Sequence, residues 1–233
     1  MGKVIMSGIV PHVFAPGAHP VFAENSWEDI IKACQTNKVP DTWAVGDQKP
    51  MTINGQEYLI DIIGKNHDTY SSGGIAPLTF QMHDCYGTKY GISQYGTHTG
   101  RWSKMYMRTT VLPMIKALMP AEVISALRTV VKKSLDGYYS NNTSVETTQD
   151  DLFLLSEKEV FDVITFSMGN EGAQYEYYAA GNSAIKTING SGTSWYERSP
   201  NRENQWGVVS TIGTPSLVAD NSESAGVAFA FCF

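Results

Sequence analysis

Seven residues at the C-terminal end of the sequence, Val227–Phe233, constrain the fold more than any other stretch. Bulky Val227, Phe229, Phe231 and Phe233 alternate with small Ala228, Ala230 and Cys232. This alternation is typical of a β-strand, because successive side chains of a strand point to opposite faces. Neither face carries a charged group, so we expect a strand that is buried on both sides and tied into the core.

A hairpin is predicted near the middle of the N-terminal half. Asn54-Gly55 lies between two β-prone runs, and Asn-Gly suits the positive φ angles of a type I′ turn. We therefore expect strands at 49–53 and 56–63, followed by a polar, glycine-rich loop at 64–77. The segment LTFQMHD that follows is expected to form another strand.

Helical signals occur in three places. Ser26 and Asp29 form a capping box for a helix over 26–36, and Ser156 and Glu159 do the same for a brief helix at EKEVF. Between Ser103 and Lys133 the apolar spacing predicts two helices, with Pro120 in the first turn of the second. Arg128, Lys132 and Lys133 would then lie at the negative end of the second helix dipole.

The remaining segments predict loops and short strands. We expect a polar loop at 136–150 and a short buried strand at DLFLLS. After Gly169 no helical periodicity remains. Prolines at 11, 16 and 20 predict that residues 1–24 form an extended arm, either a flexible leader or an attachment to a larger assembly. Residues 25–233 are expected to form a single α+β domain.

Charge and apolar patterning exclude several classes of protein. The net charge is −6 and the sequence has no Lys/Arg runs, which argues against nucleic acid and anionic membranes as partners. No apolar run has the length of a transmembrane helix or signal peptide, so we expect synthesis in the cytoplasm without export. Cys34, Cys85 and Cys232 are isolated from one another, which indicates buried free thiols.

Catalytic and metal motifs are weak. His67 and His83 have acidic neighbours, but adjacent strand residues point to opposite faces, so structural histidines with local hydrogen bonds are favoured over metal ligands. No G-x-S-x-G elbow, reactive cysteine motif or phosphate loop occurs. We therefore expect no catalytic residue, no metal and no cofactor, and a protein that is not an enzyme.

The segment 175–206 has a different composition. Tyrosines, asparagines, serines and glycines alternate with Trp195 and Trp206, a mixture typical of adaptable binding surfaces. A solvated loop region is the alternative. The two tryptophans favour an ordered, irregular segment, because tryptophan is costly on a purely solvated loop.

Several motifs in order resemble a domain of unknown function of bacterial and phage proteins, the type with a W-W-x-R-S-P motif followed by G-V-x-x-A-F-C. The matching stretches are WEDIIKACQ, VGDQK, INGQEYLIDIIGKNHD, PLTFQMHDC, MRTT, LFLLSEKEVF, EGAQYEYY, WYERSP and GVAFAFCF. Tyr196 departs from the pattern, which usually has a second tryptophan there. That family is similar to the C-type-lectin-like fold of formylglycine-generating-type domains and of the variable proteins of diversity-generating retroelements.

The resemblance implies a C-type-lectin-like fold with two main helices, short antiparallel strands and a loop-rich C-terminal half. Trp195, Arg198, Ser199, Pro200 and the last strand would form its fixed scaffold. Exposed residues between them would contact a ligand. The expected ligand-binding residues are Tyr177, Tyr178, Asn182, Tyr196, Glu197, Asn201, Arg202, Glu203, Asn204, Gln205, Trp206 and Ser210. No E-P-N or Q-P-D motif occurs, so no calcium-dependent sugar site is expected.

The resulting functional hypothesis is a non-enzymatic receptor-recognition protein with a hypervariable C-terminal surface. Its partner would be a protein or glycan on a target cell surface, and its location a phage tail or another virion part, with possible assembly through the N-terminal arm. A formylglycine-generating-type enzyme, or a metal enzyme using His67 or His83, is one alternative. A structural virion decoration protein is the other.

Overall fold

The structure is a computed structural model, which describes residues 17–93, 100–137, 144–167, 170–202, 205–219 and 225–233. The helices are α1 (Trp27–Gln35), α2 (Leu112–Lys116), α3 (Ala121–Ala126), α4 (Glu157–Phe161) and α5 (Glu176–Ala179). Short turns of 3-10 helix form η1 (Phe22–Glu24) and η2 (Trp102–Lys104), and one π-helical turn forms η3 (Met107–Val111). The strands are β1 (Gln48–Ile53), β2 (Gln56–Lys65), β3 (Leu78–Met82), β4 (Val130–Leu135), β5 (Val145–Asp150), β6 (Leu152–Phe153), β7 (Lys186–Ile188), β8 (Ser191–Thr193), β9 (Trp195–Arg202), β10 (Gln205–Val209), β11 (Pro215–Ala219) and β12 (Ala230–Cys232).

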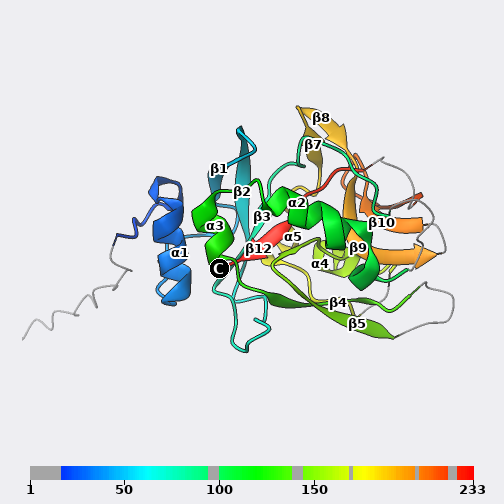
Figure 1. The fold of residues 1–233 in the computed structure, drawn as a ribbon, viewed down its shortest axis with the longest axis horizontal. Helices are drawn as coiled ribbons and strands as arrows, with labels where there is room; N and C mark the ends of the chain where they lie inside the picture. The colour runs from blue at the N-terminus through cyan, green and yellow to red at the C-terminus, as the bar shows by residue number, and fades with distance from the viewer. Residues whose placement is uncertain (1–16, 94–99, 138–143, 168–169, 203–204, 220–224) are drawn as a thin grey trace, which may run out of the picture.

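The largest sheet has five antiparallel strands in the order β1-β2-β3-β12-β6. The C-terminal strand β12 lies between β3 and β6, so that Phe231 is paired with Phe80 on one side and with Leu152 on the other. All seven residues of Val227–Phe233 are fully buried. The predicted burial on both faces is confirmed, but the strand is shorter than predicted, because only Ala230–Cys232 of the seven residues form β12. Figure 1 shows the chain's C-terminus in the middle of the molecule.

Aromatic side chains fill the core beside this sheet. Trp27 of α1 packs edge-on against Phe80 and Phe233, and Phe80 stacks on Phe231 with ring centroids 5.4 Å apart. Phe22 packs edge-on against Trp43. Edge-to-face and offset pairs of this kind stabilise a core beyond their buried area alone. Residues just before α1 thus belong to the core, while 1–16 of the predicted arm lie outside the described residues.

Local sequence signals explain several elements as predicted. Ser26 and Asp29 form the reciprocal capping box of α1, and Ser156 and Glu159 form that of α4. Asn54 and Gly55 both have positive φ, as the β1–β2 hairpin turn requires. The predicted strand at LTFQMHD is β3.

The described residues form three smaller sheets around this core. They are β11-β10-β9, the ribbon β4-β5 and the hairpin β7-β8. Figure 1 shows the β7–β8 hairpin and the β4–β5 ribbon at opposite edges of the molecule, with β9 and β10 at the end away from α1. The architecture is therefore mixed α and β, with mostly antiparallel strands and short helices. No helix in the described part of the chain is long and apolar enough to cross a membrane.

The second helix predicted before Lys133 is wrong beyond Ala126. Helix α3 ends at Ala126, and Val130–Leu135 form β4, paired with β5 inside the predicted loop at 136–150. The backbone amides of this segment donate to carbonyls outside a helix: the Arg128 amide to the Cys232 carbonyl and the Val131 amide to the Thr69 carbonyl. β-Branched Thr129, Val130 and Val131 favour the strand. The helix-dipole role expected for Arg128, Lys132 and Lys133 is wrong for the same reason.

A short helix also occurs where none was expected after Gly169. Helix α5 covers only four residues, too few for apolar periodicity to appear in the sequence. Its side chains explain why it forms: Tyr177 and Tyr178 are buried and pack edge-on against each other.

Candidate ligand-binding site

Six of the twelve residues expected to bind a ligand are buried. Tyr177, Tyr178, Tyr196, Glu197, Asn201 and Trp206 are each less than a tenth exposed, so the expectation that they lie at the surface is wrong. Asn182 and Gln205 are exposed and Ser210 is partly exposed, as expected. Glu203, Asn204 and the side chain of Arg202 lie outside the described residues.

The buried tyrosines and tryptophan have structural partners. The Tyr178 hydroxyl donates to Gln81 at 2.6 Å, and the Tyr175 hydroxyl donates to Asp68 at 2.8 Å. Trp206 donates its indole N–H to the Glu197 carbonyl at 2.7 Å. A buried aromatic residue with a polar tip needs such a partner, which composition does not reveal. The Tyr-rich composition that is typical of a binding surface therefore belongs in part to the interior of this protein.

The predicted scaffold is confirmed as buried framework. Trp195, Arg198 and Ser199 are at most 1% exposed, and Pro200 is buried with them. Arg198 donates to the carbonyls of Lys133 and Leu154 and to the carboxylate of Glu159. One side chain thus joins β4, the segment after β6 and α4, and positions β9 against them.

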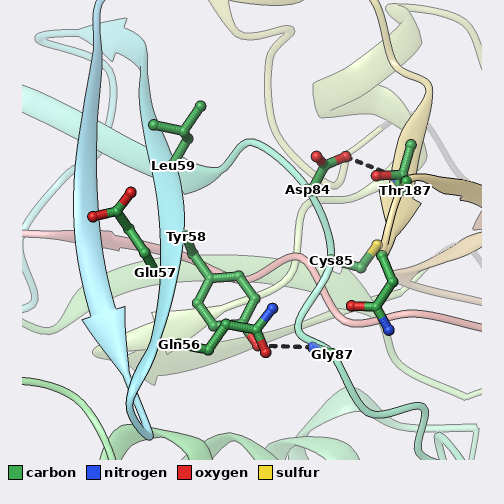
Figure 2. A pocket seen from close by; sticks show the side chains of 10 residues that line it. Gln56, Glu57, Tyr58, Leu59, Asp84, Cys85, Gly87 and Thr187 are labelled. Carbon is green, nitrogen blue, oxygen red and sulfur yellow. Dashed lines mark hydrogen bonds between the residues drawn. The ribbon is translucent and has the colours of Figure 1, made fainter.

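A polar cleft lies between the β1–β2 hairpin, the segment 84–88 and the β7–β8 hairpin. Figure 2 shows Gln56–Leu59 of β2 on one side of it, with Asp84, Cys85 and Gly87 facing them and Thr187 beyond. Its volume is about 230 Å³, and a second hollow of about 130 Å³ adjoins it. The two hollows share Gln56, Tyr58, Gly87 and Asn189.

Two Asn-Gly turns frame this cleft. Asn189 and Gly190 have positive φ, as Asn54 and Gly55 do, so both hairpins turn through the type I′ conformation. Tight two-residue turns fix the register of their strands and hold the hairpin tips rigidly. The Asn-Gly pair at 189–190 is the sequence signal for the second turn, by the same rule that applies to Asn54-Gly55.

Backbone contacts fix the floor of the cleft. The Gly87 amide donates to the Tyr58 hydroxyl at 3.1 Å, and the Thr187 amide donates to Asp84 at 2.6 Å (Figure 2). A Cβ at residue 87 would lie 3.1 Å from the Tyr58 hydroxyl, so glycine permits the close approach. The floor is therefore built before any ligand arrives.

The rim of the cleft retains free polar groups. Gln56, Glu57 and Asn189 are exposed, and within the described chain their side chains have no hydrogen bond or ion pair. Leu59 adds an apolar surface that is 41% exposed. The cleft thus offers amide donors and acceptors, carboxylate acceptors and an apolar side chain.

A histidine–aspartate pair lies next to the cleft. His83 Nδ1 is 2.9 Å from the buried carboxylate of Asp61, which also accepts from Gln48 at 2.8 Å. The hydrogen bond that the His83 ring donates to Asp61 raises the pKa of His83 above its ordinary value, although partial burial opposes this. His83 thus pairs with a residue on the neighbouring strand. His67 instead stacks on Tyr175, with ring centroids 3.9 Å apart.

The thiols are built into the interior. All three cysteines are free and buried, as predicted. Burial raises the pKa of Cys34 and of Cys85 to about 12, so neither thiol is ionised at neutral pH. In the described parts of the chain, no three His, Cys, Asp or Glu side chains are placed to hold a metal ion together.

Comparison with known families provides one match. The sequence model of a domain of unknown function, DUF6273, matches residues 103–233, more than half of the chain. The chain belongs to the DUF6273 family. Neither the curated proteins nor the solved structures contain a match to this chain.

The DUF6273 segment shares the large sheet and the cleft with the residues before it. Its strand β12 lies beside β3, and its β7–β8 hairpin faces β2 across the cleft. Residues 48–82 thus supply three of the five strands of the sheet that holds the C-terminal strand of the DUF6273 segment. The cleft is lined by residues of the DUF6273 segment and by residues that precede it.

Proposed function

We propose that this protein is a non-enzymatic ligand-binding module and that the cleft between its two Asn-Gly hairpins binds a glycan. The observation that carries the proposal is the convergence of three polar side chains, Gln56, Glu57 and Asn189, which have no partner among the described residues, on a cleft with a fixed floor. A preformed hollow with a few convergent polar groups is the usual form of a small-ligand site.

The chemistry of the rim suits a polyhydroxylated ligand. Each sugar hydroxyl both donates and accepts, so it pairs with the amides of Gln56 and Asn189 and with the carboxylate of Glu57. Leu59 offers a surface for the C–H face of a sugar ring. Because the hairpins are already ordered, binding costs little conformational entropy.

A C-type-lectin-like fold, a phage-tail location and retroelement diversification remain proposals that rest on the motif resemblance. The burial of Tyr196, Glu197 and Trp206 restricts any displayed variation to exposed positions such as Asn182, Gln205 and Ser210. Sequencing the locus in related isolates tests this. Substitutions concentrated at those exposed positions support diversification, and evenly distributed substitutions contradict it.

Glycan binding is tested directly with a panel of neutral, amino and acidic oligosaccharides. Wild-type protein is compared with Gln56→Ala, Asn189→Ala and the control Gln205→Ala, whose exposed side chain lies on β10 in another sheet. We expect the two cleft variants to lose binding about tenfold or more and the control to retain it. If the wild type binds no glycan, or if only Gln205→Ala weakens binding, the proposed site is wrong.

A further inference from the structure

A second cavity lies on another side of the molecule, between the segment 66–69, strand β4 and residues 171–173. Its volume is about 440 Å³, and its walls include His67, Asp68, Lys132, Glu159 and Glu171. None of these residues lines the cleft between the Asn-Gly hairpins. Its size suits a small organic molecule.

The cavity opens where β4 separates from the segment beside it. The Val131 amide donates to the Thr69 carbonyl, and the Leu135 amide donates to the Glu171 carboxylate at 2.8 Å. Alternate amides of a strand point to the same edge, so the Lys133 amide between them points toward the cavity as well. It has no acceptor among the described residues, whereas a backbone N–H normally has a partner.

The carboxylates in the cavity wall already accept hydrogen bonds from other groups of the protein. Asp68 accepts from Lys132, Tyr175 and Thr79. Glu159 is bound by Lys132 and Arg198, and Glu171 accepts from Leu135 and Ser199. These carboxylates therefore have little capacity left for a donor on a ligand.

The groups that remain available are mainly donors. Lys133 is exposed at the cavity and has no ion pair within the described residues. Neither ring nitrogen of His67 has a hydrogen bond to any described residue, and the ring stacks on Tyr175. The formal charges of Asp68, Glu159 and Glu171 are equalled by those of Lys132, Arg198 and the unpaired Lys133 of the described chain, so the cavity wall carries no net negative charge before a ligand binds.

We propose that this cavity binds a small organic carboxylate, whose oxygens accept from the Lys133 backbone amide and interact with the Lys133 ammonium and the His67 ring. Glu171 provides the internal precedent, because its carboxylate accepts from the next outward-facing amide of the same strand. The site is independent of the proposed glycan cleft.

Lowering the pH strengthens such binding. Burial raises the pKa of Glu171 to about 7, so acidification removes a negative charge from the wall. Burial lowers the pKa of His67, opposed by Asp68 and Glu159 and supported by Lys132 and Arg198, so the ring gains its proton below its ordinary range. Both changes strengthen the binding of a ligand that is still an anion at the lower pH.

The test uses a matched pair of ligands, D-glucuronate and D-glucose, in calorimetric titrations at pH 7.0 and 5.5. We expect glucuronate to bind more tightly than glucose, and more tightly at pH 5.5. Lys133→Gln should lose about tenfold or more in affinity, while Lys38→Gln, which removes an exposed charge elsewhere, should bind as wild type does. Equal binding of the two sugars, no binding of either, or unchanged binding by Lys133→Gln would overturn the proposal.

Discussion

The guanidinium of Arg198 meets the carboxylate of Glu159 in a two-point ion pair, with both side chains at most 2% exposed. Arg198 lies on β9 and Glu159 on α4, so the pair joins this strand to a helix that precedes it in the sequence. Lys132 of β4 is bound to the same carboxylate at 2.7 Å. The planar fork of arginine matches a carboxylate in this geometry, which the ammonium of lysine cannot reproduce.

Replacement of Arg198 by methionine should lower the free energy of unfolding by about 3–5 kcal/mol, because it leaves Glu159 with only part of its compensation in the interior. Urea denaturation at pH 7 measures the loss. The control Lys158→Ala breaks the Lys158–Asp162 pair near the surface and should cost only about 0.3–0.5 kcal/mol. If the two variants lose similar amounts, Arg198 does not hold the framework together.

Glu197→Gln should stabilise the protein at neutral and higher pH. Burial raises the pKa of Glu197 well above its usual value, with the nearby Glu157 and Glu171 adding to the rise, and its Oε1 has no partner among the described residues. The folded state keeps the proton that the unfolded chain releases, so wild-type stability falls as the pH rises above about 4.5. Denaturation at pH 4.5 and 7.5 should show little difference at the lower pH and a more stable variant at the higher. An advantage that does not grow with pH would contradict this.

Asp68→Asn should remove a source of acid sensitivity. Burial alone would raise the pKa of Asp68 above the ordinary 3.8 of an aspartate, but Lys132 and Thr79 outweigh it and lower the pKa to about 2. The wild type therefore loses about 2 kcal/mol as the pH falls from about 4 to 2. The asparagine variant should be less stable at pH 7 and lose less over that acid range. Parallel acid profiles for the two proteins would show that Asp68 is not the titrating group.

Trp206→Ala and Gln205→Ala should change the stability of the protein by very different amounts, although the two residues are neighbours in the sequence. Trp206 is fully buried and bonded to the Glu197 carbonyl, so its truncation should cost about 3–5 kcal/mol. Gln205 is exposed, and its replacement should change stability by less than about 0.5 kcal/mol. Thermal unfolding of both variants measures the contrast. Equal melting temperatures would place Trp206 at the surface after all.

Local sequence signals predicted several elements of the fold. The capping boxes of Ser26 and Ser156, the Asn54-Gly55 turn and the alternation at Val227–Phe233 each predicted an element that the structure contains. These signals depend on residues close in sequence. The β4 strand was missed because its pairing with β5 and with Thr69 is tertiary, and the apolar spacing at 123–131 fits a helix equally well.

The candidate site was harder to predict for a related reason. Composition indicated that the Tyr/Asn/Trp-rich segment was unusual, but it gives no information on which side chains point inward. Tyr178 and Trp206 can point inward because Gln81 and the Glu197 carbonyl accept hydrogen bonds from them. The cleft joins residues 54–59, 84–88 and 187–190, a proximity that only the folded chain creates.

The most direct test of the proposed glycan cleft is a map of backbone amide chemical shifts during titration with a glycan that the panel identifies. We predict that the largest changes fall on residues 54–59, 84–88 and 187–190, and that they disappear in Asn189→Ala at the same glycan concentration. Changes centred instead on Asn182, Gln205 and Ser210, with the hairpin residues unmoved, would contradict the assignment of the cleft as the binding site.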